Sequence, residues 1–217
     1  MGKIGLGCLA LVVLLIVIIG ISVAGTNNRL VTKSQEVDKQ WAQVENQYQR
    51  RADLVPNLVA TVQGAAQFEK STLEEVTRAR ASVGQANVNP GQAPTDPAQL
   101  AKFEQAQAAL GSALSRLLVV VEKYPELKAN ANFRDLQAQL EGTENRIAVE
   151  RMRFNEVAQD YNTTLMKFPT NITGRMLGFK EKPYFHGTPG SERPPAVNFN
   201  FGATPAAPSV PSPAPAR

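Results

Sequence analysis

This 217-residue chain has few of the side chains from which catalytic and metal sites are usually built. It has one cysteine and one histidine, Cys8 and His186. A single cysteine cannot close an intramolecular disulfide, and neither a Cys/His zinc set nor a Ser/His/Asp triad is well supplied. No sign of charge dominates either, since 23 basic residues stand against 19 acidic ones. Composition therefore points away from an enzyme, a cofactor or metal site, and a nucleic-acid partner.

A long apolar run near the N-terminus is the first positive feature. Residues 4–24 carry no charge, and Ser22 is their one polar side chain. As a helix this run is about 31 Å long, enough to cross a hydrocarbon core of about 30 Å. Ser22, Val23 and Ala24 also fit a signal-peptide cleavage site, but signal peptides have shorter apolar regions of about 7–15 residues. We therefore expect residues 1–3 to precede an uncleaved transmembrane helix at 4–24 that binds the lipid bilayer.

Beyond this run, apolar side chains recur at every third or fourth position from Leu30 to Val83. This spacing places them on one face of a helix and predicts a narrow seam of the coiled-coil type. Two seven-residue registers describe the seam: Leu30, Val37, Val44, Arg51, Leu58, Ala65, Thr72 and Ala79, and Ser34, Trp41, Tyr48, Val55, Val62, Glu69, Val76 and Val83. The apolar members, with Trp41 and Tyr48 among them, are predicted to form the core of a bundle.

Pro56 interrupts the seam and leaves two topologies open. Proline lacks an N–H and clashes with the preceding helical turn. A reversal at Pro56 would give helices near 28–55 and 57–84, similar in length to the next one at 97–124, as an antiparallel four-helix bundle requires. A kink at Pro56, which the unbroken register of the seam favours, would give three long helices. We favour four helices, and both topologies are all-α and up-and-down.

Capping residues mark the ends of the later helices. Asp96 is suited to cap a helix whose first residue is Pro97, and Pro125 ends that helix. The last helix is predicted to start after Asn132 and to end before Pro169.

The chain loses its helical periodicity after the last helix. Residues 169–187 mix aromatic and turn residues, so we expect an irregular segment packed on the bundle through Phe179, Tyr184 and Phe185. The bundle domain then spans residues 27–187. Residues 188–217 are rich in proline and poor in aromatic and charged side chains, which predicts a disordered tail.

Four stretches carry a family resemblance: VDKQWAQVENQYQRRADLVPNLVATVQG (37–64), EKSTLEEVTRARA (69–81), EKYPELKANANFRDLQAQLEGTENRIAVERMRFNEVAQDYN (122–162) and GFKEKPYF (178–185). Together they resemble the LemA family of bacterial membrane proteins over about residues 29–185. The resemblance implies one N-terminal membrane helix followed by a helical bundle. It also implies an association with membrane remodelling in magnetosome formation or with a membrane protease, and it names no reaction.

Polar residues at or near the seams are the candidate functional residues: Arg51, Glu69, Asn145, Arg146, Glu150, Arg151 and Asn155. Charges in a core are costly unless paired, so we expect ion pairs and hydrogen bonds that fix the register of the bundle. Arg146 and Glu150, and likewise Arg151 and Asn155, are four residues apart and share a helix face. A polar cleft for a ligand or a partner peptide is a second interpretation. A catalytic pair of Glu69 and Glu150 is a third.

These observations predict a single-pass protein of the bacterial cytoplasmic membrane that acts as a non-catalytic scaffold or adaptor. The alternative is an interaction module that regulates a membrane protease or an envelope stress response, and self-association is a further option for its partner. Lys3 flanks the span on one side, and Arg29, Lys33 and Lys39 flank it on the other. Because flanking basic residues prefer the cytoplasm, we expect the bundle there, whereas cleavage at Ala24 would export it.

Overall fold

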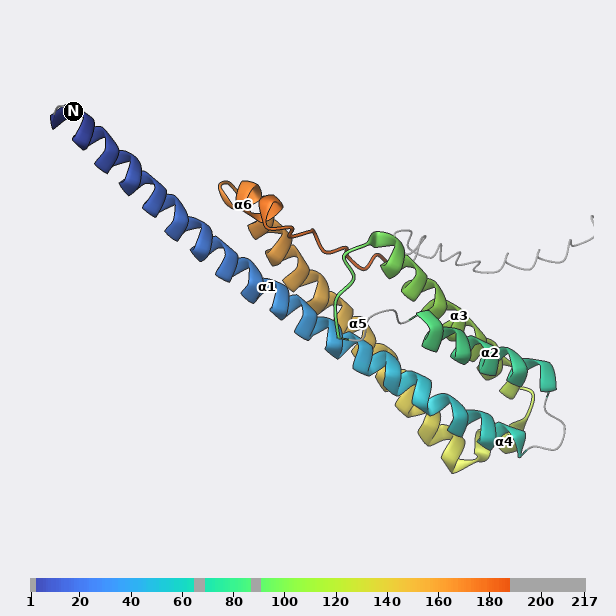
Figure 1. Cartoon of the computed structure of the whole chain (residues 1–217). Coiled ribbons are helices and arrows are strands. Elements are labelled where there is room, and N and C mark those ends of the chain that lie inside the picture. Colours follow the sequence, from blue (N-terminus) through green and yellow to red (C-terminus); the bar gives the residue numbers. More distant parts are fainter. Residues whose placement is uncertain (1–2, 65–68, 87–90, 188–217) are drawn as a thin grey trace, which may run out of the picture. The chain divides into compact units, whose positions relative to one another are not determined.

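The structure is a computed structural model of the chain and describes residues 3–64, 69–86 and 91–187. In these ranges every regular element is a helix (Figure 1): α1 (Lys3–Gln63), α2 (Lys70–Ala86), α3 (Pro97–Val121), α4 (Pro125–Ala129), α5 (Ala131–Met166) and α6 (Thr170–Met176). The predicted all-α class is confirmed. The chain divides into a unit at Met1–Phe185 and a unit at His186–Arg217. The predicted disordered tail, 188–217, lies outside the described residues.

Helix α1 joins the apolar run to the bundle without a break. It passes through Pro56, so the predicted reversal at that residue is wrong. Pro56 cannot donate a hydrogen bond to the carbonyl of Ala52, its partner in an unbroken helix. The side chain of Arg80, on α2, donates to that carbonyl instead, with Nε 2.9 Å from the oxygen. A contact with another helix therefore lets α1 continue to Gln63.

The bundle part of α1 and the helices α2, α3 and α5 nevertheless form four long helical segments of the described chain. Successive segments alternate in direction (Figure 1). The bundle part of α1 packs chiefly on α5, and α2 packs chiefly on α3. The second segment is only 17 residues long, because the reversal follows Gln63 rather than Pro56. The predicted cap of α3 is confirmed, since the side chain of Asp96 accepts a hydrogen bond from the backbone N–H of Ala98 at 2.8 Å.

Two short helices were not predicted. α4 occupies the turn between α3 and α5, and α6 follows α5 within the segment expected to be irregular. At Gly174 of α6, a Cβ atom would lie 2.5 Å from Cδ1 of Leu165 and 3.4 Å from Cδ1 of Leu30. This close approach seats α6 against both α1 and α5.

The core consists of two hydrophobic clusters along the bundle. The first is centred on Trp41, whose ring lies 5.2 Å from Phe103, 5.5 Å from Phe154 and 5.8 Å from Phe185 between centroids. The second is mostly aliphatic and lies toward the C-terminal end of α1, with Val55, Leu58, Val62, Val76, Leu110, Leu114 and Leu117 among its members. The predicted core positions of Trp41 and Tyr48 are confirmed, as is the packing of Phe179, Tyr184 and Phe185 on the bundle.

Candidate functional site

Arg51 is the most deeply buried of the charged residues that the sequence analysis selected as candidate functional residues. Only 4% of the residue is exposed. Its guanidinium bridges three helices: Nη1 of Arg51, on α1, lies 2.9 Å from Oε1 of Glu144 on α5. Its Nη2 donates to the backbone carbonyl of Gln107 on α3 at 3.0 Å and also to the side-chain oxygen of that residue. Arg51 therefore ties α1, α3 and α5 together at one level.

The surroundings of Arg51 explain how its charge is accommodated. The guanidinium carbon lies 5.1 Å from the centroid of the Tyr48 ring, within the range of a cation–π interaction. Burial raises the pKa of the Tyr48 hydroxyl, and the nearby positive charges of Arg151 and Arg51 partly oppose that rise. Glu144 remains 44% exposed at its side chain, so water reaches the anionic end of the pair. The ion pair therefore links the helices through a buried guanidinium and a solvent-accessible carboxylate.

The other polar residues of α5 also contact neighbouring helices. Glu150 is mostly buried, accepts a hydrogen bond from Nε2 of Gln40 on α1 at 2.6 Å, and pairs with Arg153 on its own helix. Arg151 pairs with Glu104 on α3 at 2.8 Å. Its guanidinium also lies 4.6 Å from the centroid of the Phe185 ring.

Two asparagines of α5 bind the backbone of the segment that follows α6. Asn155 donates to the carbonyl of Phe185 and accepts from its N–H, both at 2.9 Å. Asn162 is 2% exposed and makes the same reciprocal pair with the backbone of Lys182, at 2.8 and 2.9 Å. An amide side chain presents one acceptor and a donor group side by side, which matches an extended backbone. The hydrogen bonds with Asn162 hold Lys182 against the bundle, where the residue is buried.

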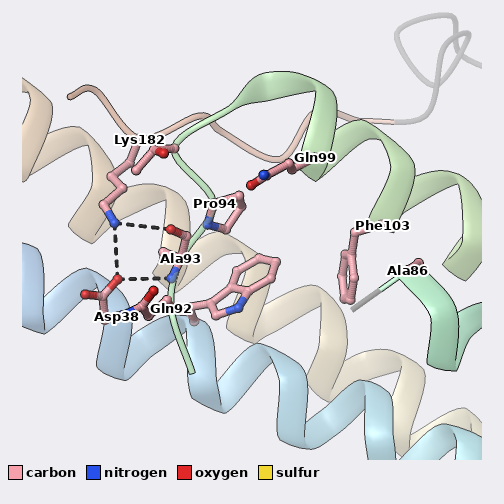
Figure 2. Close-up of a pocket in the computed structure, with 10 residues that line it drawn as sticks. Asp38, Ala86, Gln92, Ala93, Pro94, Gln99, Phe103 and Lys182 are labelled. Carbon is pink, nitrogen blue, oxygen red and sulfur yellow. Dashed lines mark hydrogen bonds and ion pairs between the residues drawn. The ribbon is translucent and has the colours of Figure 1, made fainter. Parts of the chain in front are cut away.

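Lys182 lies beside a cavity of about 260 Å³ (Figure 2). Its ammonium is 3.2 Å from Oδ1 of Asp38 and 3.2 Å from the carbonyl of Ala93. The same carboxylate oxygen of Asp38 accepts from the N–H of Ala93 at 3.0 Å. Trp41 and Phe103 contribute aromatic surface to the cavity wall. The closed triangle of Asp38, Ala93 and Lys182 pins the loop before α3 between α1 and the segment after α6.

The cavity combines a charge-balanced pair with polar and aromatic walls. Asp38 and Lys182 neutralise each other, and Thr95 and Gln99 add polar groups to the described lining. Nε1 of Trp41 is buried and finds no hydrogen-bond partner among the residues that the structure describes. Across the described parts of the chain, no three Asp, Glu, His or Cys residues gather as a metal site would require.

Three predicted site residues lie at the surface. Glu69 is exposed, lies directly before α2 begins at Lys70, and pairs with Lys123 at 3.7 Å. Asn145 and Arg146 are exposed on α5. Glu150 pairs with Arg153, Arg151 pairs with Glu104, and Asn155 binds the backbone of Phe185. Glu69 and Glu150, the carboxylates of the third interpretation, engage separate partners.

Sequence reasoning missed Lys182, Asp38, Gln107 and Asn162 as members of these polar clusters. Asp38 and Lys182 are 144 positions apart, and no periodicity connects them. The available signal was the GFKEKPYF stretch, which places a lysine among aromatic residues predicted to pack on the bundle.

Comparison with known proteins confirms the predicted family resemblance. Residues 40–199 match the LemA family. The chain is 28% identical over 183 residues to the magnetosome protein MamQ of Magnetospirillum gryphiswaldense, covering 77% of this chain and 67% of that protein. MamQ 2 of Paramagnetospirillum magneticum is similar to the same extent. Protein LemA of Metamycoplasma hominis is 22% identical over 153 residues, covering 70% of this chain and 65% of the relative.

Proposed function

This chain belongs to the LemA family, and on that premise we propose that it is a membrane-anchored helical adaptor that organises a membrane without catalysing a reaction. The observation that carries the proposal is the continuity of α1. The helix runs from the apolar stretch into the first position of the bundle core, Leu30, with no linker between them.

The apolar stretch of α1 has the properties of a membrane span. Its large apolar side chains are 50–69% exposed all around the helix: Leu9, Leu11, Val12, Val13, Leu14, Leu15, Ile16, Val17, Ile18, Ile19 and Ile21. By length and composition, α1 is the one helix in the described part of the chain that qualifies as a span. An apolar surface of this size is not stable in water, and a bilayer would cover all sides of it.

The continuity of α1 has a mechanical consequence. A flexible linker would let the bundle sample many distances from the bilayer. A continuous helix advances about 1.5 Å per residue and fixes both the distance and the orientation of what it carries. An adaptor needs such a fixed display, because its partners are also embedded in or bound to the same surface.

We place the protein in the cytoplasmic membrane as a single-pass protein with its bundle in the cytoplasm. Supporting this orientation, Arg29, Lys33 and Lys39 follow the span while Lys3 alone precedes it. The relatives named as magnetosome proteins favour membrane organisation as the setting.

Photo-crosslinking in native membranes tests the proposal. A photoreactive amino acid is placed in the full chain at the exposed positions Val119 on α3 and Val149 on α5. A second chain carries a flexible Gly/Ser insert between Gly25 and Thr26, and a third lacks residues 4–24. We expect adducts of defined mass from the first chain, weaker adducts after the insertion, and loss of membrane retention after the deletion.

The outcomes separate the parts of the proposal. Membrane retention after deletion of 4–24 would contradict the anchor. Adducts that the insertion leaves unchanged would contradict the fixed display, and the absence of adducts from both positions would contradict the adaptor. An adduct with a membrane protease would favour the regulatory module over a scaffold, and an adduct at twice the chain mass would favour self-association.

A further inference from the structure

One end of the bundle carries a group of exposed large apolar side chains. They are Met166 (56% exposed), Phe168 (80%), Ile172 (54%), Met176 (81%) and Leu177 (44%). We call this group the apolar cap. It comprises the end of α5, the turn that follows, and α6. Isolated exposed apolar residues are common, but five within twelve positions of one turn and helix are a marked surface feature.

The apolar cap lies at the level where the apolar stretch of α1 ends. Lys33 of α1 pairs with Asp160 of α5, and these two helices are antiparallel. Six residues before Lys33 is Asn27, and six residues after Asp160 is Met166, so Met166 lies opposite Asn27. The apolar stretch ends at Ala24, about 4–5 Å away along the helix axis. The interfacial layer of a bilayer is about 5–8 Å thick on each side, so the cap falls within it.

Contacts between α6 and α1 hold the apolar cap at this level. Gly174 on α6 is buried and approaches Leu30 of α1 and Leu165 of α5 closely. Figure 1 shows α6 beside α1, at the end of the bundle that faces the N-terminal part of the helix. The apolar cap therefore packs on the same continuous helix that forms the span, and the position of one relative to the bilayer sets the position of the other.

The charges around the apolar cap are mainly positive. Lys167, Arg175 and Lys180 are exposed. Glu181 follows directly as an exposed acidic residue and lines a pocket together with Arg175. Arg29 adds an exposed basic residue on the facing part of α1. Apolar side chains among basic ones are typical of elements that lie in the headgroup region of anionic membranes. A second copy of this chain would bring the same positive charges together, which disfavours self-association through this surface.

We propose that the apolar cap inserts into the headgroup region of the bilayer that α1 crosses, so that the bundle is attached to the anionic leaflet at two points. The inference rests on the proposed membrane anchor. It adds that the bundle cannot swivel freely about α1, because the cap fixes one face of the bundle toward the lipid.

Depth-dependent quenching of a fluorophore tests this attachment. Cys8 is the one cysteine of the chain, so a Cys8→Ser background accepts a single labelled cysteine. An environment-sensitive fluorophore is attached at Lys167→Cys beside the cap, at Val119→Cys on α3 far from the cap, or at Leu14→Cys in the span. The full chain is reconstituted in vesicles of three parts phosphatidylcholine to one part phosphatidylglycerol, with nitroxide-labelled lipids as quenchers.

The three labels distinguish this inference from the anchor itself. We expect headgroup nitroxides to quench the label at position 167 severalfold more strongly than the label at 119, and acyl-chain nitroxides to quench the label at 14. Quenching of the label at position 14, with equally weak quenching at positions 167 and 119, would refute the insertion of the apolar cap while leaving the membrane anchor intact. Absence of quenching at 14 would overturn the anchor and the cap with it.

A pair of matched variants separates lipid contact from structural damage. Phe168→Ser with Met176→Ser removes the two most exposed cap residues, and Val149→Ser with Met152→Ser removes two exposed apolar residues from the middle of α5. We expect the first pair to reduce quenching at position 167 severalfold with unchanged helical circular dichroism, and the second pair to leave quenching unchanged. The emission of the label at position 167 could instead shift with rising protein-to-lipid ratio and show no quenching by nitroxide lipids. That result would identify a second copy of the chain as the molecule that covers the apolar cap, and it would refute the proposal.

Discussion

Replacement of Arg51 by alanine is the sharpest test of how this bundle is held together. The substitution removes the group that bridges α1, α3 and α5, with contacts to Glu144 and to two oxygens of Gln107. Gln107 is 4% exposed. Its backbone carbonyl keeps the N–H of Gly111 within α3 as a donor, so the side-chain oxygen is the acceptor that would be left buried without a partner. An unsatisfied buried polar group costs about 1–3 kcal/mol.

The total effect follows from adding the remaining terms. The pair with Glu144 contributes little, about 0–1 kcal/mol, because the glutamate side chain is 44% exposed. Loss of packing by the buried stem of Arg51 adds a further ~1 kcal/mol or more. The expected loss of stability is therefore about 2–5 kcal/mol, which overlaps the range of about 3–5 kcal/mol for removal of one partner of a buried pair. With a urea m-value of about 2 kcal/mol/M, the unfolding midpoint falls by about 1–2.5 M.

The assay is urea unfolding of the full chain in detergent micelles, followed by circular dichroism of the helices. Arg78→Ala is the matched control, because Arg78 is an exposed arginine on α2 and its removal changes stability by about 0–1 kcal/mol. Equal midpoints for Arg51→Ala and Arg78→Ala would refute the reasoning. Arg51→Ala combined with Gln107→Leu should recover part of the loss, since the side-chain amide of Gln107 is then no longer orphaned.

Four further results are expected. Pro56→Ala should raise the urea midpoint, because a helix-interior proline costs up to about 3 kcal/mol; a lower midpoint would show that Pro56 is required for a turn. Asn162→Ala should expose the backbone near Lys180 to trypsin, measured as faster cleavage there than in the unmodified chain. Burial, with a smaller contribution from a nearby carboxylate, raises the pKa of the Tyr161 hydroxyl to about 12. The stability that the protonated hydroxyl contributes is therefore complete below pH 10 and is lost as pH rises from about 10 to 12. This decrease in the free energy of unfolding with pH should be absent in Tyr161→Phe. Alkaline phosphatase fused after Arg217 should be inactive and a fluorescent protein bright, and the reverse pattern would place the bundle outside the cytoplasm.

The sequence by itself determined the elements that depend on local periodicity. These elements involve residues that lie within a few turns of one another: the apolar run at 4–24, the seam from Leu30 to Val62 and the helix N-cap at Asp96. Such patterns fix which face of a helix avoids water before any partner is known. They therefore predicted the all-α class, most of the core and the burial of Arg51.

Only the tertiary structure decided the features that depend on distant partners. Pro56 does not end α1, because Arg80 satisfies the carbonyl that proline leaves open. Asp38 and Lys182 form a pair because Asn162 pairs with the backbone at Lys182 and draws that segment onto α5. The apolar cap reaches the level of the span because α5 runs antiparallel to α1. Each of these three features depends on which helices pack together. Hydrophobic periodicity does not determine the partners, because the hydrophobic effect is not directional.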